Sequence, residues 1–565
     1  MGLIADKILF NGVIYKSDEE RGYASAIAIK GKRFICVGSH DDCMKFKGEN
    51  TKVIDLKEKL VLPGLIDGHT HPETIAKSRW RVMLPETDDM HELLEFVKDY
   101  CREHPVSEVP FFFGESYPST MFDENGPRKE WLDEYISDRP VRLQDFTDHA
   151  CWYNSRALEL MGIDSSVKET GTAPYFVRDE NNEPTGWVQE PLPGSDFEET
   201  MYDKIGWHPP VSVTEESISP FLDFLKDRGV IALLDGITEG EESIRLFYDM
   251  DRCGKLNMYY EGAVLLDEFG KLEECIATAN RWRKQYTTEH VSIHTVKFFL
   301  DRTNEMGSGA SLEPHYNDPD GENYGELNMS KDELCQTLLR LNEEKLDLHI
   351  HVVCDRGFRT ACDAYECAKK QVEAEGGSWD IFMELAHCEL VHPDDVKRPA
   401  QLGIIINWTP HWAGGFFGES AIEYLGRDRW DTMYDMTGFI ESGAIMTYSS
   451  DLTGMSEEMR GDPFFGMEIS ATRIDIDSPL DPSRFPGSVR PPESAKLDIA
   501  ELIRGYTRYG AIPFRREDEI GSIEVGKLAN LTVLDKNIFD IPVDEIHTVG
   551  TEAVMFEGGF IKNSL

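Results

Sequence analysis

Two histidines separated by one residue, His69 and His71, follow an apolar run from Leu60 to Ile66 that is typical of a buried strand. Successive side chains on a strand alternate between its faces, so both imidazoles point the same way. Two imidazoles at one strand end can bind a single metal ion. A bare His-x-His also fits two ordinary histidines in a turn. The surrounding glycines and proline, and further candidate ligands downstream, favour the metal site.

Length and charge limit the class of protein. A chain of 565 residues exceeds the usual size of one hydrophobic core, so more than one domain is expected. The formal charge of −46 argues against nucleic-acid or anionic-membrane partners. No apolar leader and no run near the ~18 residues of a membrane span are present in the sequence. Eleven cysteines without paired short spacings predict reduced thiols, and we expect a cytoplasmic location.

The alternation of strand-like and helix-like segments predicts an α/β fold. Both chain ends carry short β-like runs, which we expect to pair into one small β-sandwich. Eight apolar runs in between match the count of a (β/α)₈ TIM-type barrel. These runs are 60–66, 230–234, 258–264, 293–299, 346–353, 382–387, 403–408 and 444–449.

Two further apolar runs, 111–113 and 141–146, fall between the first and second barrel strands and predict an inserted subdomain. The expected organisation therefore has five segments. They are 1–58 (first part of the β-sandwich), 59–75 (start of the barrel), 76–215 (inserted subdomain), 216–515 (metal-binding barrel) and 516–565 (second part of the β-sandwich).

Lys297 lies inside an apolar strand, where a charged amine is costly unless it is paired or modified. Burial lowers the pKa of a lysine and leaves a neutral amine, which can react with CO₂ to give a carbamate. A carbamate is an anionic ligand able to bridge two metals. The alternative is a lysine at the strand end whose amine reaches solvent.

Further candidate ligands end the later strands. His349 and His351 share one face of their strand, and His387 ends the next one. Asp451 follows the last strand, where it suits either a helix N-cap or a metal ligand that is also a general base. Because catalytic groups gather at the carboxyl ends of barrel strands, these side chains are expected to meet there.

The chain resembles the amidohydrolase superfamily of metal-dependent hydrolases, and within it the branch that includes N-substituted formamide deformylases. The resemblance covers nearly the whole chain. It is carried by the segments 63–71 (PGLIDGHTH), 148–158 (DHACWYNSRAL), 185–190 (TGWVQE), 296–301 (VKFFLD), 349–355 (HIHVVCD), 449–451 (SSD) and 521–531 (GSIEVGKLANL).

The resemblance implies a ligand set and a cofactor. His69, His71 and Asp451 would hold one divalent metal, and a carboxylated Lys297 would bridge to a second one held by two further histidines, His351 and His387. Zinc is the expected metal, manganese and iron also suit nitrogen and oxygen ligands, and one or two ions are compatible with the set. A homodimer is likewise implied by the resemblance alone.

The substrate is less constrained. The aromatic-rich segment 408–417 follows the seventh strand and is expected to hang over the barrel mouth, where His411 and Trp412 would contact substrate. The alternative is that this loop packs its aromatics against the insert. His149 and Trp152 are expected to approach from the inserted subdomain, although His149 also suits a structural cap. Arg302 stands where the family often has glycine and is a further candidate contact.

The predicted function is metal-dependent hydrolysis of a carbon–nitrogen bond in a small non-peptide amide, an N-formyl or N-acyl amine, by a metal-bound hydroxide. A cyclic-amide or imidazolone-type hydrolase, or a deaminase, would use the same ligands. A non-catalytic binding protein on the same barrel is the alternative from another class. It would not need Asp451 and Lys297 together.

Overall fold

The computed structural model describes residues 3–85, 87–118, 121–123, 125–145, 150–168, 175–189, 196–210, 212–414, 418–476, 483 and 488–565. The chain divides into two compact units. The first contains Met1–Glu73, Val213–Leu452 and Glu457–Leu565, and the second contains Thr74–Ser212 with Thr453–Ser456. No helix among the described residues is long and apolar enough to cross a membrane.

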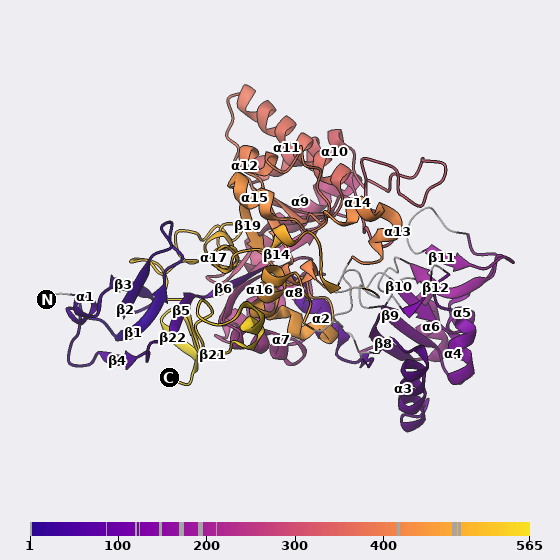
Figure 1. The fold of residues 1–565 in the computed structure, drawn as a ribbon, viewed down its shortest axis with the longest axis horizontal. Helices are drawn as coiled ribbons and strands as arrows, with labels where there is room; N and C mark the ends of the chain where they lie inside the picture. Colours follow the sequence, from indigo (N-terminus) through magenta and orange to yellow (C-terminus); the bar gives the residue numbers. More distant parts are fainter. Residues whose placement is uncertain are drawn as a thin grey trace. The chain divides into compact units, whose positions relative to one another are not determined.

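Both ends of the chain contribute strands to one sheet in the first unit (Figure 1). The antiparallel pairing of β5 with β20 joins the two ends, and α1 (His40–Met44) packs against β1, β2 and β3. Leucine, isoleucine and valine side chains from both ends fill its core. The prediction of a small β-sandwich built from both ends is confirmed. Its strands are β1 (Lys7–Tyr15), β2 (Tyr23–Lys30), β3 (Arg33–Gly38), β4 (Lys52–Asp55), β5 (Leu60–Pro63), β20 (Leu531–Leu534), β21 (Thr551–Phe556) and β22 (Gly559–Asn563).

A parallel eight-stranded sheet forms the rest of the first unit, in the order β6-β13-β14-β15-β16-β17-β18-β19. Beyond the end of β19 the chain meets the first strand again, because Asp451 N donates to His69 O (2.8 Å) and His71 N donates to Leu452 O (3.0 Å). The predicted (β/α)₈ barrel is confirmed. Its strands are β6 (Leu65–Thr70), β13 (Val230–Asp235), β14 (Tyr259–Leu265), β15 (Val291–Phe299), β16 (Asp347–Val352), β17 (Met383–His387), β18 (Ile405–Trp408) and β19 (Ile445–Tyr448).

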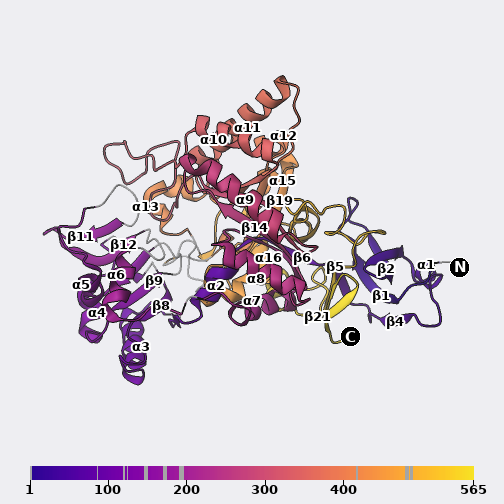
Figure 2. The same ribbon diagram turned by 180° about the vertical axis from the view of Figure 1, so that it is seen from behind.

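Helices follow the barrel strands and lie outside them, as Figure 2 shows for α7, α8 and α9. Local sequence fixes their ends. Ser330 and Glu333, for example, form a capping box at the start of α10. The helices are α2 (Pro72–Ser78), α7 (Glu215–Asp227), α8 (Glu241–Arg252), α9 (Leu272–Tyr286), α10 (Lys331–Glu344), α11 (Asp355–Ala374), α12 (Arg398–Leu402), α13 (Ala421–Leu425), α14 (Arg427–Trp430), α15 (Thr437–Ser442), α16 (Pro463–Thr472) and α17 (Ile499–Arg504).

The prediction of a single strand from Leu60 to Ile66 is wrong. Its first four residues form β5 in the terminal sheet, and the barrel strand β6 begins only at Leu65. The chain changes partner at Gly64, whose N–H donates to Asn530 O (3.2 Å), while Leu65 N donates to Gly229 O (2.9 Å). A Cβ at Gly64 would lie 2.4 Å from Ile231 Cγ1, so glycine permits this close crossing.

The second unit has its own six-stranded sheet in the order β11-β12-β10-β9-β8-β7. The apolar runs 111–113 and 141–146 contribute to β8 and β9 of this sheet, with Phe146 outside the described residues. Two aromatic-rich cores pack against it. Its elements are β7 (Val82–Met83), α3 (Met90–Glu103), β8 (Phe112–Tyr117), α4 (Lys129–Tyr135), β9 (Val141–Asp145), β10 (Ala150–Tyr153), α5 (Ser155–Met161), β11 (Tyr175–Arg178), β12 (Pro184–Gln189) and α6 (Asp196–Ile205).

Candidate metal centre

Polar side chains converge at the carboxyl ends of five barrel strands. His69 lies near the end of β6 and His71 directly follows that strand, whereas Lys297 lies within β15. Strands β16 and β17 supply three imidazoles, and Asp451 lies just beyond β19. The strands themselves are apolar and buried, so they hold these groups inside the barrel rather than on its surface.

His69 is at the centre of the group. Its Nε2 lies 3.2 Å from Nε2 of His71 and 3.3 Å from Nζ of Lys297. The same nitrogen lies 3.4 Å from Oδ1 of Asp451, which is also 3.2 Å from Nε2 of His71. Four groups able to bind a cation therefore face one small volume.

His387 lies beside Asp451, and His351 lies next to His387. Nδ1 of His387 lies 3.5 Å from Oδ2 of Asp451, and the rings of the two histidines are 4.5 Å apart. Nε2 of His351 donates to the carbonyl of Arg302 (3.1 Å), so a neutral ring carries its free electron pair on Nδ1. The structure thus brings together all six residues predicted as metal ligands.

Burial and mutual repulsion shift the ionisation of these groups. Burial lowers the pKa of Lys297 to about 7, so much of its amine is neutral near neutral pH. Burial, reinforced by neighbouring positive groups, lowers the pKa of His69 and of His387 well below the usual range. Burial alone would raise the pKa of Asp451, but His387, His71 and Lys297 hold it well below its usual range. Burial therefore favours neutral imidazoles on His69 and His387 beside the Asp451 carboxylate.

The backbone is strained where it presents two of these side chains. His387, Cys388 and Asp451 have φ values of 78°, 49° and 48°, in the left-handed region that non-glycine residues rarely adopt. Such strain costs on the order of 1–3 kcal/mol per residue and clusters at functional sites. The surrounding structure thus keeps His387 and Asp451 in position at an energetic cost.

The residues fit a divalent metal. Both ring nitrogens of His387 are buried and make no hydrogen bond within the described part of the chain. An unsatisfied buried polar group costs about 1–3 kcal/mol, which coordination would remove. His69, His387 and Asp451 also offer one ligand atom each within 4.8 Å of one another. Imidazole and carboxylate donors suit zinc, manganese and iron.

Asp67 was not assigned a role from the sequence, yet it fixes the segments that carry three ligands. Its Oδ1 accepts from the backbone N–H of His69 (3.2 Å) and of Ser450 (2.9 Å). Its Oδ2 accepts from the Ser450 hydroxyl (2.6 Å). The signal in the sequence was an acidic residue directly after the apolar run Leu60 to Ile66, two positions before His69.

Gly236 is a second residue that sequence reasoning missed. It follows β13, and its N–H donates to Thr70 O (2.8 Å). A Cβ at this position would lie 2.4 Å from Nε2 of His69 and 2.9 Å from Cε1 of His71. Only glycine therefore leaves room for both imidazoles at this wall of the site.

The predicted substrate contacts on the barrel occupy different environments. Trp412 lies in the 3₁₀ turn Pro410–Ala413, and its ring stacks on His387 with centroids 5.1 Å apart and 18° between the planes. His411 is buried and donates from Nε2 to Ser450 O (2.8 Å). The Arg302 side chain pairs with Glu326 (3.1 Å). Trp412 therefore contacts a predicted ligand, His387, through its ring.

The predicted aromatic loop begins later than expected. Trp408 is a fully buried residue of β18 itself, so it does not hang over the barrel mouth, and residues 415–417 lie outside the described residues. Trp152 is buried in a core of the second unit and donates from Nε1 to Arg128 O (2.9 Å). His149 lies outside the described residues. Substrate contacts by Trp152 and His149 stay predictions.

Glu289, His290 and Glu557 form a second group of potential ligands in the first unit. The ammonium of Lys32 lies 2.6 Å from a carboxylate oxygen of each glutamate, and His290 Nδ1 pairs with Asp251 (2.6 Å). A lysine already supplies the positive charge there, so we interpret this group as an ion-pair network.

The chain is similar in sequence to known proteins over most of its length. The chain is 24% identical over 559 residues to N-substituted formamide deformylase from Arthrobacter pascens, covering 97% of this chain and 96% of that protein. It is also 24% identical over 449 residues to exoenzymes regulatory protein AepA from Pectobacterium carotovorum subsp. carotovorum, covering 78% and 93%.

Among solved structures, an uncharacterized metal-dependent hydrolase from Pyrococcus horikoshii OT3 superposes with a TM-score of 0.66 at 22% identity, covering 95% of this chain and 99% of that one. At that identity the likeness concerns the fold. The family model described as "Amidohydrolase family" matches residues 52–561. With a metal-type ligand set at the mouth of a (β/α)₈ barrel, this chain belongs to the amidohydrolase family and is a metal-dependent hydrolase.

Proposed function

We propose that this hydrolase cleaves the carbon–nitrogen bond of a small non-peptide amide, an N-formyl or N-acyl amine. The observation that carries the proposal is the convergence of His69, His71, Lys297, His351, His387 and Asp451 on one buried volume. The similarity to N-substituted formamide deformylase over nearly the whole of both chains supports the class of bond.

His69, His71 and Asp451 would hold one divalent metal, and His351 and His387 would hold a second. Zinc is the proposed metal, and a carboxylated Lys297 would supply a ligand to both metals. Bound divalent metals lower the pKa of water toward ~7 and polarise a carbonyl oxygen. The neutral amine of the buried Lys297 combines with CO₂ to form the carbamate and releases one proton.

Asp451 is the proposed general base. Its carboxylate is ionised near neutral pH, since its pKa is held well below the usual range by His387, His71 and Lys297. It can accept the proton of the attacking water and transfer it to the leaving nitrogen, as general acid–base catalysis requires. Asp451 N donates to His69 O (2.8 Å), which keeps the carboxylate beside the imidazoles.

Metal removal combined with a substrate screen tests the proposal. The purified protein is assayed for zinc, manganese and iron, then for hydrolysis of N-formyl and N-acyl amines, cyclic amides and aminated heterocycles. We expect bound metal, hydrolysis of an open-chain amide, and loss of activity on chelation that added metal restores. Full activity in metal-free protein would overturn the mechanism, and activity on cyclic amides or amino-heterocycles alone would overturn the substrate class.

The variant Asp451→Asn tests the general base within the same assay. The amide keeps the shape and one oxygen ligand but cannot accept the proton, so turnover should fall roughly 10²–10⁴-fold. Binding of substrate should change much less. Unchanged turnover would show that Asp451 is not the general base and has a structural role.

A further inference from the structure

His349 is not among the proposed ligands, yet it contacts one of them deep in the barrel. Its Nε2 lies 2.9 Å from Nδ1 of His69, and both rings are buried. Its other nitrogen, Nδ1, lies 2.7 Å from Oε2 of Glu384. His349 therefore links a buried carboxylate to the imidazole at the centre of the site.

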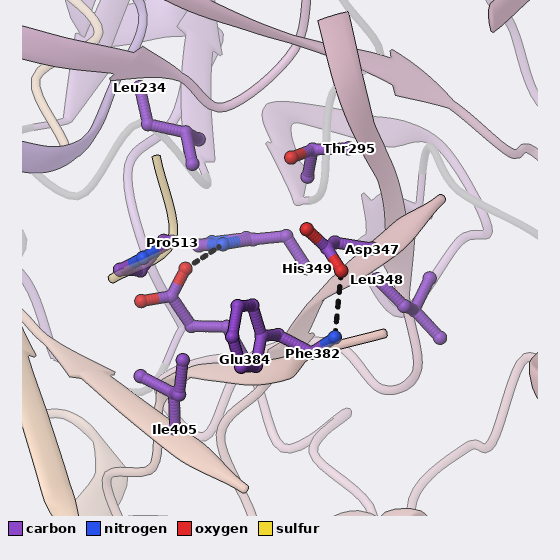
Figure 3. A pocket seen from close by; sticks show the side chains of 9 residues that line it. All are labelled: Leu234, Thr295, Asp347, Leu348, His349, Phe382, Glu384, Ile405 and Pro513. Carbon is purple, nitrogen blue, oxygen red and sulfur yellow. Dashed lines mark hydrogen bonds and ion pairs between the residues drawn. The ribbon is translucent and has the colours of Figure 1, made fainter. Parts of the chain in front are cut away.

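The pair lies on the wall of a small cavity (Figure 3). In Figure 3 the carboxylate of Glu384, from β17, faces the ring of His349, from β16. The cavity has a volume of about 10 Å³, close to the space that one water molecule needs. Both side chains are buried, and Nδ1 of His349 is paired with Glu384 rather than with bulk solvent.

The second carboxylate oxygen of Glu384, Oε1, also accepts a hydrogen bond, from β19. The Thr447 hydroxyl donates to Oε1 of Glu384 (2.6 Å) and accepts from Nδ2 of Asn407 (2.9 Å). The Ser449 hydroxyl in turn donates to Oδ1 of Asn407 (2.8 Å). Glu384 thus receives hydrogen bonds on both oxygens, as an ionised carboxylate does.

These bonds determine which nitrogen of each ring carries the proton. An ionised Glu384 requires an N–H from Nδ1 of His349, so a neutral His349 has its electron pair on Nε2. That electron pair requires an N–H from Nδ1 of His69. His69 is then left with an unprotonated Nε2, the atom that faces His71, Lys297 and Asp451.

We propose that Glu384 and His349 are positioning residues, which fix the proton of His69 on Nδ1 and hold its Nε2 ready to bind metal. The inference rests on the proposed metal centre. Carboxylates that orient a metal-binding histidine directly are common, and their loss typically costs 10–100-fold in metal affinity. Here the carboxylate acts through an intervening imidazole.

The test measures zinc binding by competition with a chromophoric chelator, independently of any substrate. His349→Phe keeps a ring of similar size but removes the acceptor for His69, and we expect its zinc affinity to fall about 10–100-fold. Glu384→Gln keeps an oxygen that can accept from His349 and should lose less. Ile405→Val, which removes one methylene from the same cavity wall, is the matched control and should bind zinc within about twofold of wild type.

A second measurement uses only the wild-type protein. Histidine-selective ¹⁵N labelling of the zinc-loaded wild-type protein should show protons on Nδ1 of both His69 and His349. Proton on Nε2 of His349, or unchanged zinc affinity in His349→Phe, would overturn this inference alone. A wild-type protein that binds no zinc, manganese or iron would overturn the proposed function, and this inference with it.

Discussion

Asp67 and Ser450 are 383 residues apart in the sequence and are joined by two hydrogen bonds, of 2.9 Å to the backbone N–H and 2.6 Å to the hydroxyl. These two bonds hold strand β6 against the segment that follows β19. His69 and His71 follow Asp67, and Asp451 follows Ser450. One buried carboxylate therefore holds together the two chain segments that supply three of the proposed ligands.

Replacing Asp67 should weaken both the fold and the metal site. Asp67→Ala leaves the Ser450 hydroxyl and two backbone N–H groups without their acceptor, which should lower the free energy of unfolding by about 2–4 kcal/mol. Ser450→Ala removes only the hydroxyl bond and should cost about 1 kcal/mol. Urea unfolding of the chelated proteins measures both values. Equal losses in the two variants would contradict the central role of Asp67.

Lys297 should carry a carbamate when CO₂ and metal are present. The burial that lowers its pKa to about 7 supplies neutral amine, and metal bound by the facing imidazoles would offset the negative charge of the carbamate. ¹³C NMR of metal-loaded protein equilibrated with ¹³C-labelled bicarbonate should show one carbamate signal, absent in Lys297→Met. An unmodified amine in fully metallated protein would make Lys297 a neighbour of the site rather than a bridging ligand.

Much of the fold and the candidates for the proposed ligand set could be predicted from the sequence, because both depend largely on local pattern. Apolar runs ending in His69, His387 or Asp451 carry their own signal of strand and site. The change of sheet at Gly64 could not be read, because it depends on the side chain of Ile231 and on Gly229, far along the chain. The proposed role of Glu384 could not be predicted from the sequence for a similar reason, since its partners lie on neighbouring strands.

The opposite end of the barrel contains a buried ion-pair network that should respond to pH. Burial disfavours protonation of His294, but Glu261 (2.8 Å) and Asp347 (3.6 Å) outweigh it and raise its pKa to about 9. Arg515 pairs with Asp347 on the same side. The pKa of histidine is ≈ 6.5 in unfolded chains, so the stabilisation by His294 is fully present below that pH. It is lost as the pH rises through about 9.

The variant His294→Gln isolates this contribution. Its unfolding free energy should be lower than that of wild type by on the order of 2 kcal/mol at pH 6, with the difference shrinking by pH 10. Urea unfolding of chelated protein across this pH range provides the measurement. A difference that stays constant with pH would show that His294 contributes by packing rather than by charge.

Trp412 should contribute to preference for apolar or aromatic substituents on the amide. Its ring stacks on His387, so it forms an apolar wall beside a proposed ligand, and aromatic side chains supply large contact area at modest entropic cost. Trp412→Ala should raise KM for aryl-substituted amides more than for small ones, whereas Trp412→Phe should retain most of the preference. Metal content measured in parallel separates this role from the orientation of His387. An equal rise for all substrates together with lost metal would mean that Trp412 orients the ligand. A preference for carboxylate-bearing substrates would instead point to the guanidinium of Arg302. The backbone carbonyl of this residue already accepts a hydrogen bond from His351.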